Sequence, residues 1–445
     1  MRKGRIQNTG TDYRRKRRPG LGITPPTPAS PARIIPAVSL AIILAILAAG
    51  CMPPGPGSGG SVFPSLAPRG FPANPTSIEL AVSAPDMETM SRTIDPGESS
   101  ISLEVPAGAA REFSLTASNV SVTTSGFTVA DLPAGAAVEI SIPLHLRETR
   151  IIVPDAFNNR IVQIDDMTGG GWKTLLYSDI GLADWEFEPA EVDFDDSGRI
   201  YAALTGELQG VIVLDSIDAS SYEMFVPGSV TEGTVDYYTK QVIAVDRNRD
   251  LLYIPAEADT DGNLVYELFV LAFSTDGGAG LQSAYDLSSD TGTLTLSDIF
   301  AMGVDSSGHL YLIGSPDGSV IYKLDLSQPA GSRVVDSVSF SDFNPADMMV
   351  KDDKLYVGGT YSVVAGGPIR RYDLDLNQEG SDITGKADAT DPFFGVAAFL
   401  QHPGGGFLVA DTDGEVSRLV AFDDFTTSGW STFAPEDIGE LFFLF

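Results

Sequence analysis

Apolar and polar residues alternate along residues 76–147 with the period of two that is typical of a β-strand. Turn sequences such as Asp95-Pro96-Gly97 separate the alternating runs, and this combination indicates short antiparallel strands with one buried face. The alternating apolar positions are Ile78, Leu80, Val82, Ile101, Leu103, Val105, Phe113, Leu115, Val138, Ile140 and Ile142. Because two sheets can bury each other's apolar faces, residues 76–147 predict a small antiparallel β-sandwich.

A second pattern recurs six times along residues 148–445. Each copy is built around an apolar strand. Another strand and an Asp/Gly turn come before this strand, and a strand that usually ends in aspartate comes after it. The repeat is about 51 residues long on average, in the range of propeller blades. Its matching positions are Ile152, Tyr201, Tyr253, Tyr311, Tyr356 and Leu408.

A single unit leaves its two apolar faces exposed, whereas six units arranged radially bury these faces against one another. No segment of useful length has the period of a helix. We therefore predict an all-β fold in which a small antiparallel β-sandwich, residues 76–147, is followed by a six-bladed β-propeller, residues 148–445. The first copy lacks an innermost strand, and residues 435–445 echo the sequences that start innermost strands elsewhere, so we expect this tail to complete the first blade.

The segment VPDAFNNRIVQI, residues 153–164, resembles the NHL repeat, in which a strand and an aspartate are followed by Asn-Arg-Ile opening the next strand. The other five copies keep the rhythm of the strands without the Asn-Arg-Ile. The resemblance implies a propeller fold, and it implies little about function, because such propellers bind proteins, sugars and RNA and also include enzymes.

An apolar run at residues 34–49 follows a strongly basic segment and ends in Leu47-Ala48-Ala49-Gly50-Cys51. This order of charge, apolar core and small residues is typical of an export signal, and the run is shorter than the roughly 20 residues of a membrane-spanning helix. The end of the run resembles the lipobox of bacterial lipoproteins, in which the chain is cut before the cysteine and the cysteine is acylated. The resemblance implies that residues 1–50 are a signal peptide, that Cys51 carries the lipid, and that the protein lies on the extracytoplasmic side of a membrane in the cell envelope.

Residues 51–75 are rich in proline, glycine and serine and predict an unfolded tether. Beyond the signal, residues 51–445 contain 19 basic and 59 acidic residues, a formal net charge of −40. Such a charge repels phosphate backbones and anionic lipid headgroups, so we expect no nucleic-acid partner and membrane contact through the lipid anchor alone. Cys51 is the only cysteine, so no internal disulfide forms.

Candidate ligand-binding chemistry is confined to acids that follow the repeated strand, namely Asp155, Glu257 and Asp411. Turns between second and third strands share one end of a propeller channel, so these carboxylates are candidates for a rim that binds a polar ligand or calcium. The alternative is that each aspartate caps its own turn. Residues 259–263 and 411–415 look like fragments of calcium loops without the full ligand pattern, so no metal ligand or other cofactor is assigned.

Catalytic residues are not identified. The histidines are His145 at the junction of the predicted domains and His309 and His402, which are expected in turns at the channel end opposite the acids. No nucleophile or metal motif occurs. The sequence therefore favours a binding or scaffold module for a protein or glycan partner in the envelope. The alternative is a propeller hydrolase or lyase, with or without calcium, that uses acids at the channel mouth.

Overall fold

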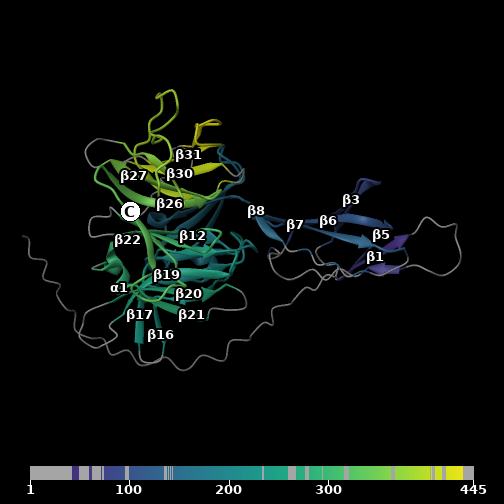
Figure 1. Cartoon of the computed structure of the whole chain (residues 1–445), viewed down its shortest axis with the longest axis horizontal. Coiled ribbons are helices and arrows are strands. Elements are labelled where there is room, and N and C mark those ends of the chain that lie inside the picture. Colours follow the sequence, from purple (N-terminus) through teal and green to yellow (C-terminus); the bar gives the residue numbers. More distant parts are fainter. Residues whose placement is uncertain are drawn as a thin grey trace, which may run out of the picture. The chain divides into compact units, whose positions relative to one another are not determined.

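The structure of the chain is a computed structural model. The described residues are 43–49, 60–62, 72, 75–95, 100–134, 138, 140, 142, 144–232, 235–258, 267–275, 280–292, 294–314, 320–361, 366–400, 402, 406–412 and 417–433. Cys51, the basic segment, the fragments at 259–263 and 413–415 and the tail at 435–445 lie outside them. The chain is nearly all β (Figure 1). The described helical elements are short: α1 (Ser288–Thr291) and the 3-10 turns η1 (Ala156–Asn158), η2 (Tyr177–Ile180), η3 (Asp184–Glu186) and η4 (Leu296–Asp298).

The N-terminal strands form two sheets that share one apolar core. The first has the order β4-β3-β6-β7-β8 and the second the order β2-β1-β5. Ile78, Leu80, Phe113 and Leu115 from the first sheet are buried in one cluster with Val105 from the second. The strands are β1 (Ile43–Ala49), β2 (Gly60–Val62), β3 (Ser77–Ala84), β4 (Met87–Ile94), β5 (Ser100–Pro106), β6 (Gly108–Ser118), β7 (Val122–Leu132) and β8 (His145–Thr149).

The predicted alternation is confirmed for the strands that contain Leu80, Val105 and Phe113. The prediction of a strand through Val138, Ile140 and Ile142 is wrong for these described positions, which belong to no strand. Ile140 and Ile142 are nevertheless buried in the core. Burial of these two side chains therefore accounts for their apolar character without a strand at these positions.

The apolar run assigned to the signal contributes strand β1, which pairs in parallel with β5 and antiparallel with β2. Within the described residues, no helix has the length and hydropathy needed to cross a membrane. In the full chain the end of the run is therefore part of a sheet, and the second sheet would lose its middle strand if the chain were cut before Cys51.

Six antiparallel sheets follow along the chain, coloured from blue through green to yellow in Figure 1. The first three contain β9 (Ile151–Asp155), β10 (Arg160–Ile164) and β11 (Lys173–Leu176); β12 (Pro189–Phe194), β13 (Ile200–Leu204), β14 (Gly210–Leu214) and β15 (Glu223–Pro227); and β16 (Ser229–Glu232), β17 (Val235–Thr239), β18 (Ala244–Asp246), β19 (Leu251–Ala258), β20 (Glu267–Ser274) and β21 (Leu281–Asp286). The last three contain β22 (Ile299–Val304), β23 (Leu310–Gly314), β24 (Val320–Leu324) and β25 (Val334–Ser339); β26 (Phe343–Lys351), β27 (Lys354–Tyr361) and β28 (Ile369–Asp373); and β29 (Val396–Leu400), β30 (Phe407–Thr412), β31 (Ser417–Phe422) and β32 (Ser431–Phe433).

All six repeated segments of the sequence are strands, and we call them the second strands: β9, β13, β19, β23, β27 and β30. Every residue of β13 and of β23 is buried, because each sheet is covered on both faces by its neighbours. Tyr201 and Tyr311, at matching positions of the repeat, are fully buried. Their hydroxyls donate hydrogen bonds to the carboxylates of Asp195 and Asp305, which lie in the preceding turns. In these two sheets the repeated tyrosine thus ties the turn to its own sheet.

The sheets contact one another in a closed cycle. We call β12, β18, β22, β26 and β29 the inner strands, because each precedes and pairs with the second strand of its sheet. The contacts run from β9 to β12, then to β18, β22, β26 and β29, and from β29 back to β9. The first sheet has no inner strand among the described residues, so β9 takes that place. The prediction that the tail supplies the missing strand concerns residues outside the described part.

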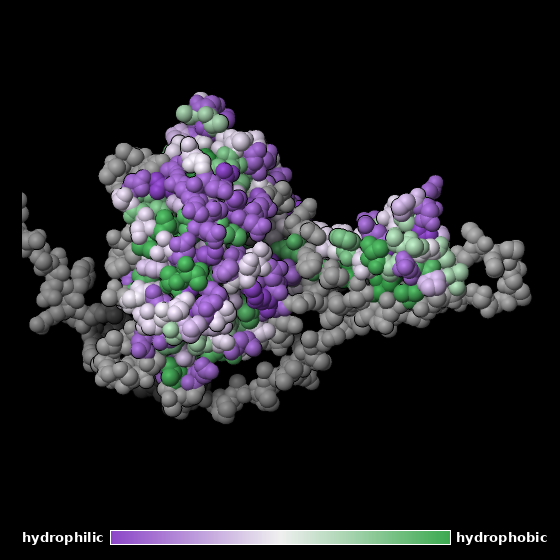
Figure 2. Space-filling model, in the orientation of Figure 1, coloured by the Kyte–Doolittle hydropathy of each residue, from purple (hydrophilic) through white to green (hydrophobic). Residues whose placement is uncertain are grey.

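The inner strands share a local irregularity. In β12, β22, β26 and β29 the pairing register shifts by one residue near the start of the strand, at Ala190, Phe300, Ala346 and Ala397. Such a bulge redirects the side chains that follow it. On the face shown in Figure 2, hydrophilic residues predominate and apolar residues lie in separate small groups.

Candidate ligand site in the central channel

Two of the predicted acids are structural. The carboxylate of Asp155, at the end of β9, is buried and accepts hydrogen bonds from Arg160 Nε at 2.6 Å and from Asn158 Nδ2. Asp411, on β30, is also buried, and it accepts hydrogen bonds from Arg418 Nε at 2.7 Å and from the backbone of Phe394 and Gly395. Asp155 and Arg160 belong to the segment that resembles the NHL repeat, so this motif builds a turn around an ion pair.

The third predicted acid, Glu257, is partly buried on β19 and lies opposite Tyr238 and Leu268 in neighbouring strands. Within the described residues, no group of three or more histidine, cysteine, aspartate or glutamate side chains is arranged to hold a metal ion. The structure therefore places the three acids on three different sheets, with two of the carboxylates held by arginines. Ligand binding by these residues stays a prediction.

The histidines occupy the predicted turns. His309 lies between β22 and β23, and its Nδ1 is 3.1 Å from the carboxylate of Asp305. His402 lies between β29 and β30, where its Nδ1 accepts a hydrogen bond from the backbone of Gly406, and burial lowers its pKa. His145 is the first residue of β8. Each described imidazole thus lies in or beside a strand connection and away from Asp155 and Asp411 in the topology.

A cavity of about 860 Å³ lies inside the cycle of sheets. Its wall is formed by the inner strands β12, β18, β22, β26 and β29, with Pro154 contributed by the first sheet. We call this cavity the channel. Its volume falls in the range of about 300–1,000 Å³ that is usual for small-ligand sites. Apolar side chains such as Met302, Met348 and Phe399 alternate with polar ones along the wall.

Three carboxylates of the channel wall join neighbouring sheets. Glu191 accepts a hydrogen bond from the backbone N–H of Ile243 at 2.9 Å, and Asp193 accepts one from Val245 at 3.1 Å. The carboxylate of Asp347 accepts a hydrogen bond from the backbone N–H of Phe399 at 2.6 Å. In each case the acceptor stands on one inner strand and the donor lies 52 residues later, in the next sheet. A carboxylate therefore satisfies N–H groups that no neighbouring strand reaches.

Two of these carboxyl groups have raised pKa values. Burial raises the pKa of Glu191 well above its ordinary value, and the charges of Asp347 and Asp193 add to the shift. Burial raises the pKa of Asp347 to about 7, against the hydrogen bonds from Phe399 and Met348, which lower it. Both carboxyl groups therefore keep their proton to a higher pH than an exposed carboxyl does, and Asp347 is close to half protonated at pH 7.

One end of the channel carries an exposed aromatic ring beside a lysine. Phe300 is 47% exposed although it belongs to strand β22. The Lys240 ammonium lies 5.5 Å from the centre of this ring and donates hydrogen bonds to the carbonyl groups of Ser297 and Ile299. Burial lowers the pKa of Lys240. Pro154, Thr205 and Thr360 line the same cavity at or just past the ends of second strands.

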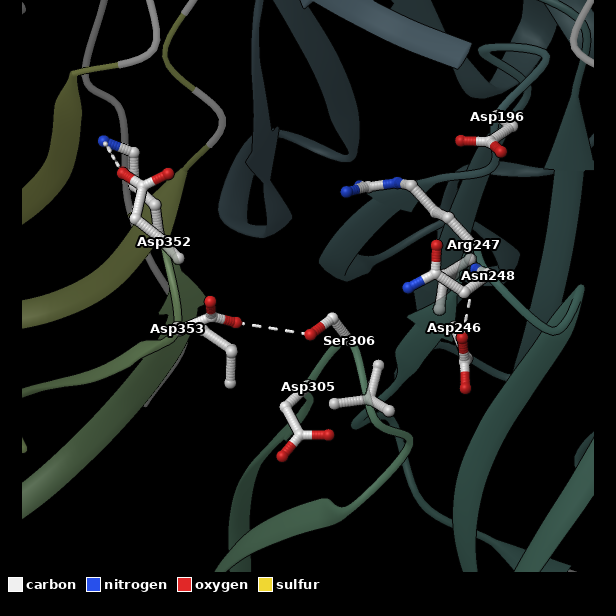
Figure 3. A pocket seen from close by; sticks show the side chains of 12 residues that line it. Asp196, Asp246, Arg247, Asn248, Asp305, Ser306, Asp352 and Asp353 are labelled. Carbon is white, nitrogen blue, oxygen red and sulfur yellow. Dashed lines mark hydrogen bonds and ion pairs between the residues drawn. The ribbon is translucent and has the colours of Figure 1, made fainter. Parts of the chain in front are cut away.

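A second cavity of about 430 Å³ is lined by the turns that follow the inner strands (Figure 3). It shares Val245, Arg247, Val304 and Val350 with the channel. Its acids are Asp196, Asp246, Asp305, Asp352 and Asp353. Asp246 and Asp305 are buried and accept hydrogen bonds from Arg249 and His309 in their own turns. Asp353 accepts one from Ser306, and Arg247 extends toward the open space between the turns.

Sequence reasoning missed the channel carboxylates. The signal was present, because Pro189-Ala190-Glu191-Val192 and Pro345-Ala346-Asp347-Met348 share a pattern that marks the start of an inner strand. That the acid in this pattern faces the channel follows from the bulge before it. The predicted acids lie instead at the ends of second strands.

No protein-family model matches the chain, and no curated protein sequence matches it. Among solved structures it is similar to the calcium-binding protein regucalcin of Agrobacterium tumefaciens strain C58, with 9% identity, a TM-score of 0.35 and coverage of 60% of this chain and 75% of that one. It is similar to the dihydro-heme d1 dehydrogenase NirN in complex with DHE, with 12% identity, a TM-score of 0.38 and coverage of 65% and 64%. It is also similar to the β-propeller domain of the Trilobed protease from Pyrococcus furiosus, with 10% identity, a TM-score of 0.30 and coverage of 76% of this chain and 95% of that one.

The class of this protein follows from its own sheets. Antiparallel sheets in cyclic contact around a cavity define a β-propeller. The NHL resemblance is limited to the single segment described above and stays a hypothesis.

Asp411 is expected to contribute to stability. Replacing Asp411 by Ala leaves the half-buried Arg418 without one of its two carboxylates, so we expect the free energy of unfolding to fall by about 3 kcal/mol in urea denaturation. The matched control is Asp375→Ala, because Asp375 forms an ion pair with Lys323 at 2.9 Å but its side chain is 81% exposed. The control should lose less than about 1 kcal/mol. Equal losses in the two variants would contradict the structural role of Asp411.

Asp347 is expected to make stability depend on pH. Because its pKa is raised in the folded protein, the folded chain holds a proton between about pH 4 and pH 7 that the unfolded chain has released, so stability falls as pH rises through this window. Asp347→Asn mimics the protonated form at every pH. The stability of the variant relative to the wild type should therefore increase between about pH 5 and pH 8, by at most about 1.4 kcal/mol per pH unit. Denaturation curves at several pH values check this, and a constant difference would refute it.

Proposed function

We propose that this chain is an exported, lipid-anchored envelope protein with a six-bladed propeller that binds a glycan in its channel. The observation that carries the proposal is the cavity of about 860 Å³ enclosed by the inner strands. A cavity of this size accommodates a few sugar rings, whereas a folded protein partner would contact only its rim. The six blades are inferred from the agreement between the repeats of the sequence and the cyclic order of the sheets.

The lining of the channel suits a sugar. Sugars present hydroxyl groups in the plane of the ring and apolar C–H groups on its faces, so their sites combine hydrogen-bonding groups with aromatic rings. Phe300 is a large apolar residue that stays exposed at the cavity. Asn344, Thr205 and Thr360 add neutral polar side chains to the lining. The raised pKa of Glu191 favours its protonated carboxyl, which donates a hydrogen bond as well as accepting one.

The alternative function, a hydrolase or lyase, would use a pair of acids. Cleavage of a glycosidic bond by two carboxyl groups needs one protonated and one ionised partner. Burial raises the pKa of both Glu191 and Asp347 and so disfavours the ionised form of each, whereas this chemistry needs one partner that ionises readily. This supports the binding role over the enzymatic one.

Export and lipid attachment are supported by the residues around Cys51. Cleavage before Cys51 removes strand β1 from the mature protein, because β1 ends at Ala49. When the whole chain is produced in a bacterium, we expect mass spectrometry to find an acylated N-terminal Cys51, and we expect Cys51→Ser to abolish incorporation of labelled palmitate. A mature chain that still contains residues 43–49 would overturn the proposal of export by this route.

Binding in the channel is tested by filling it. Ala398 lines the cavity, so in Ala398→Trp the indole should occupy part of the space and weaken binding of oligosaccharides by at least about tenfold. The readout is a panel of labelled oligosaccharides, with bound fractions measured for the whole chain. Ala330→Trp is the control, because Ala330 is exposed in the connection between β24 and β25.

The same panel separates the alternatives. Binding that is equal in the Ala398→Trp variant and the wild type would place the glycan outside the channel and refute the proposed site. Shortened oligosaccharides after incubation with the wild type would favour the hydrolase or lyase.

A further inference from the structure

Glu191 and Asp347 occupy matching positions on two inner strands. Each follows the bulge of its strand, and each lies opposite the residue two places after the repeated tyrosine, Ala203 and Gly358 respectively. The same position holds Ala301 in β22 and Ala398 in β29. In the cycle of contacts, β12 and β26 are separated by two strands on either side, so they stand opposite each other. The channel therefore has a carboxyl group on two opposite walls.

Neither carboxyl group has a positively charged partner among the residues that the structure describes. In the described part of the chain, no lysine, arginine or histidine nitrogen lies within ion-pair distance of Glu191 or Asp347. Asp193, Arg247 and Lys240 also line the channel, and each has other partners. Asp193 forms an ion pair with Arg247 at 2.7 Å, and the Lys240 ammonium donates to backbone carbonyls at one end of the channel.

We propose that the channel ligand carries an ammonium group, which binds between Glu191 and Asp347. The inference rests on the proposed role of the channel as the ligand site, and it names the chemical class of the ligand. Ionised carboxyl groups on opposite walls of a ligand-sized cavity place negative charge on two sides of it, and an ammonium group supplies the missing counter-charge to both, whether or not it carries an N–H. The net charge of −40 of residues 51–445 attracts cations toward the protein over longer distances.

Protons are exchanged when such a ligand binds. An ammonium group favours the ionised form of both carboxyl groups, so binding releases protons from them. Asp193 and Arg247 also line the channel beside Glu191, and Glu188 and Lys240 lie at its end. Asp193 opposes the ionisation of Glu191, so the ligand charge is needed to complete it. Affinity for a permanently charged ligand should rise as pH rises through the pKa of Asp347.

The experiment uses two probes of the same shape. Choline carries a fixed positive charge, and 3,3-dimethylbutan-1-ol is its neutral carbon analogue. Isothermal titration of the whole chain should show choline binding at least about tenfold more tightly than the neutral probe at about pH 7. The heat of binding should change with the ionisation enthalpy of the buffer, which reports the released protons. Affinity for choline should be higher at about pH 8 than at about pH 6.

Two substitutions test whether Glu191 and Asp347 supply the negative charge that binds choline. Glu191→Gln and Asp347→Asn keep the size of each side chain and remove its negative charge, and each should weaken choline binding by about tenfold. Glu207→Gln is the matched control, since Glu207 is an exposed acid outside the channel lining and should leave affinity unchanged. If a variant fails to fold, the comparison of the two probes on the wild-type protein still tests whether the site prefers a positively charged ligand.

The outcomes distinguish this inference from the proposed function. Equal binding of the two probes, or choline binding that is insensitive to both variants, would overturn the ammonium site; if oligosaccharides still bound in the channel, the proposed function would stand. Choline binding that depends on Glu191, with no oligosaccharide bound, would support the ammonium site and refute the glycan. Absence of binding by all probes would refute both.

Discussion

The inner strands of this propeller converge on one axis, where each has a strand partner on one side only. The N–H groups on the other side face the channel or the next sheet, and a buried N–H without an acceptor is costly. Glu191, Asp193 and Asp347 supply acceptors at this place by reaching across to the next inner strand. The remaining structure depends on this closure, because the two buried faces of every sheet are covered only while the neighbours are held together.

The same constraint explains why the candidate site lies in the channel. Groups that satisfy the backbone near the axis are polar, whereas the second strands behind them are completely buried and apolar, as in β13 and β23. Protonation of Glu191 and Asp347 follows from this setting, since each group gains hydrogen bonds but no opposite charge in the described part of the chain. The two side chains that hold neighbouring sheets together thus also line the proposed ligand site.

The sequence was sufficient to predict the all-β class and the six second strands, because burial on both faces leaves a short, fully apolar run that recurs with the repeat. It failed at residues 138–142, where alternating burial occurs without a strand. The site was harder to predict, because acids near the ends of strands look alike in the sequence but have different surroundings in the structure. Asp411 turns to Arg418 from the adjoining strand, whereas Glu191 faces the channel only because a bulge redirects it. Neither the arginine partner nor the bulge is visible before strands are paired.

The short connection into the propeller has a mechanical consequence. A single residue, Arg150, separates β8 from β9, and among the described strands β9 pairs with β10 alone. If the chain is tethered at its N-terminal side, any pulling force between the membrane and a bound ligand reaches the ring first at β9. The hydrogen bonds to β10 and the apolar contacts around Ile152 then bear the load, so this seam decides how much tension the ring withstands before it opens.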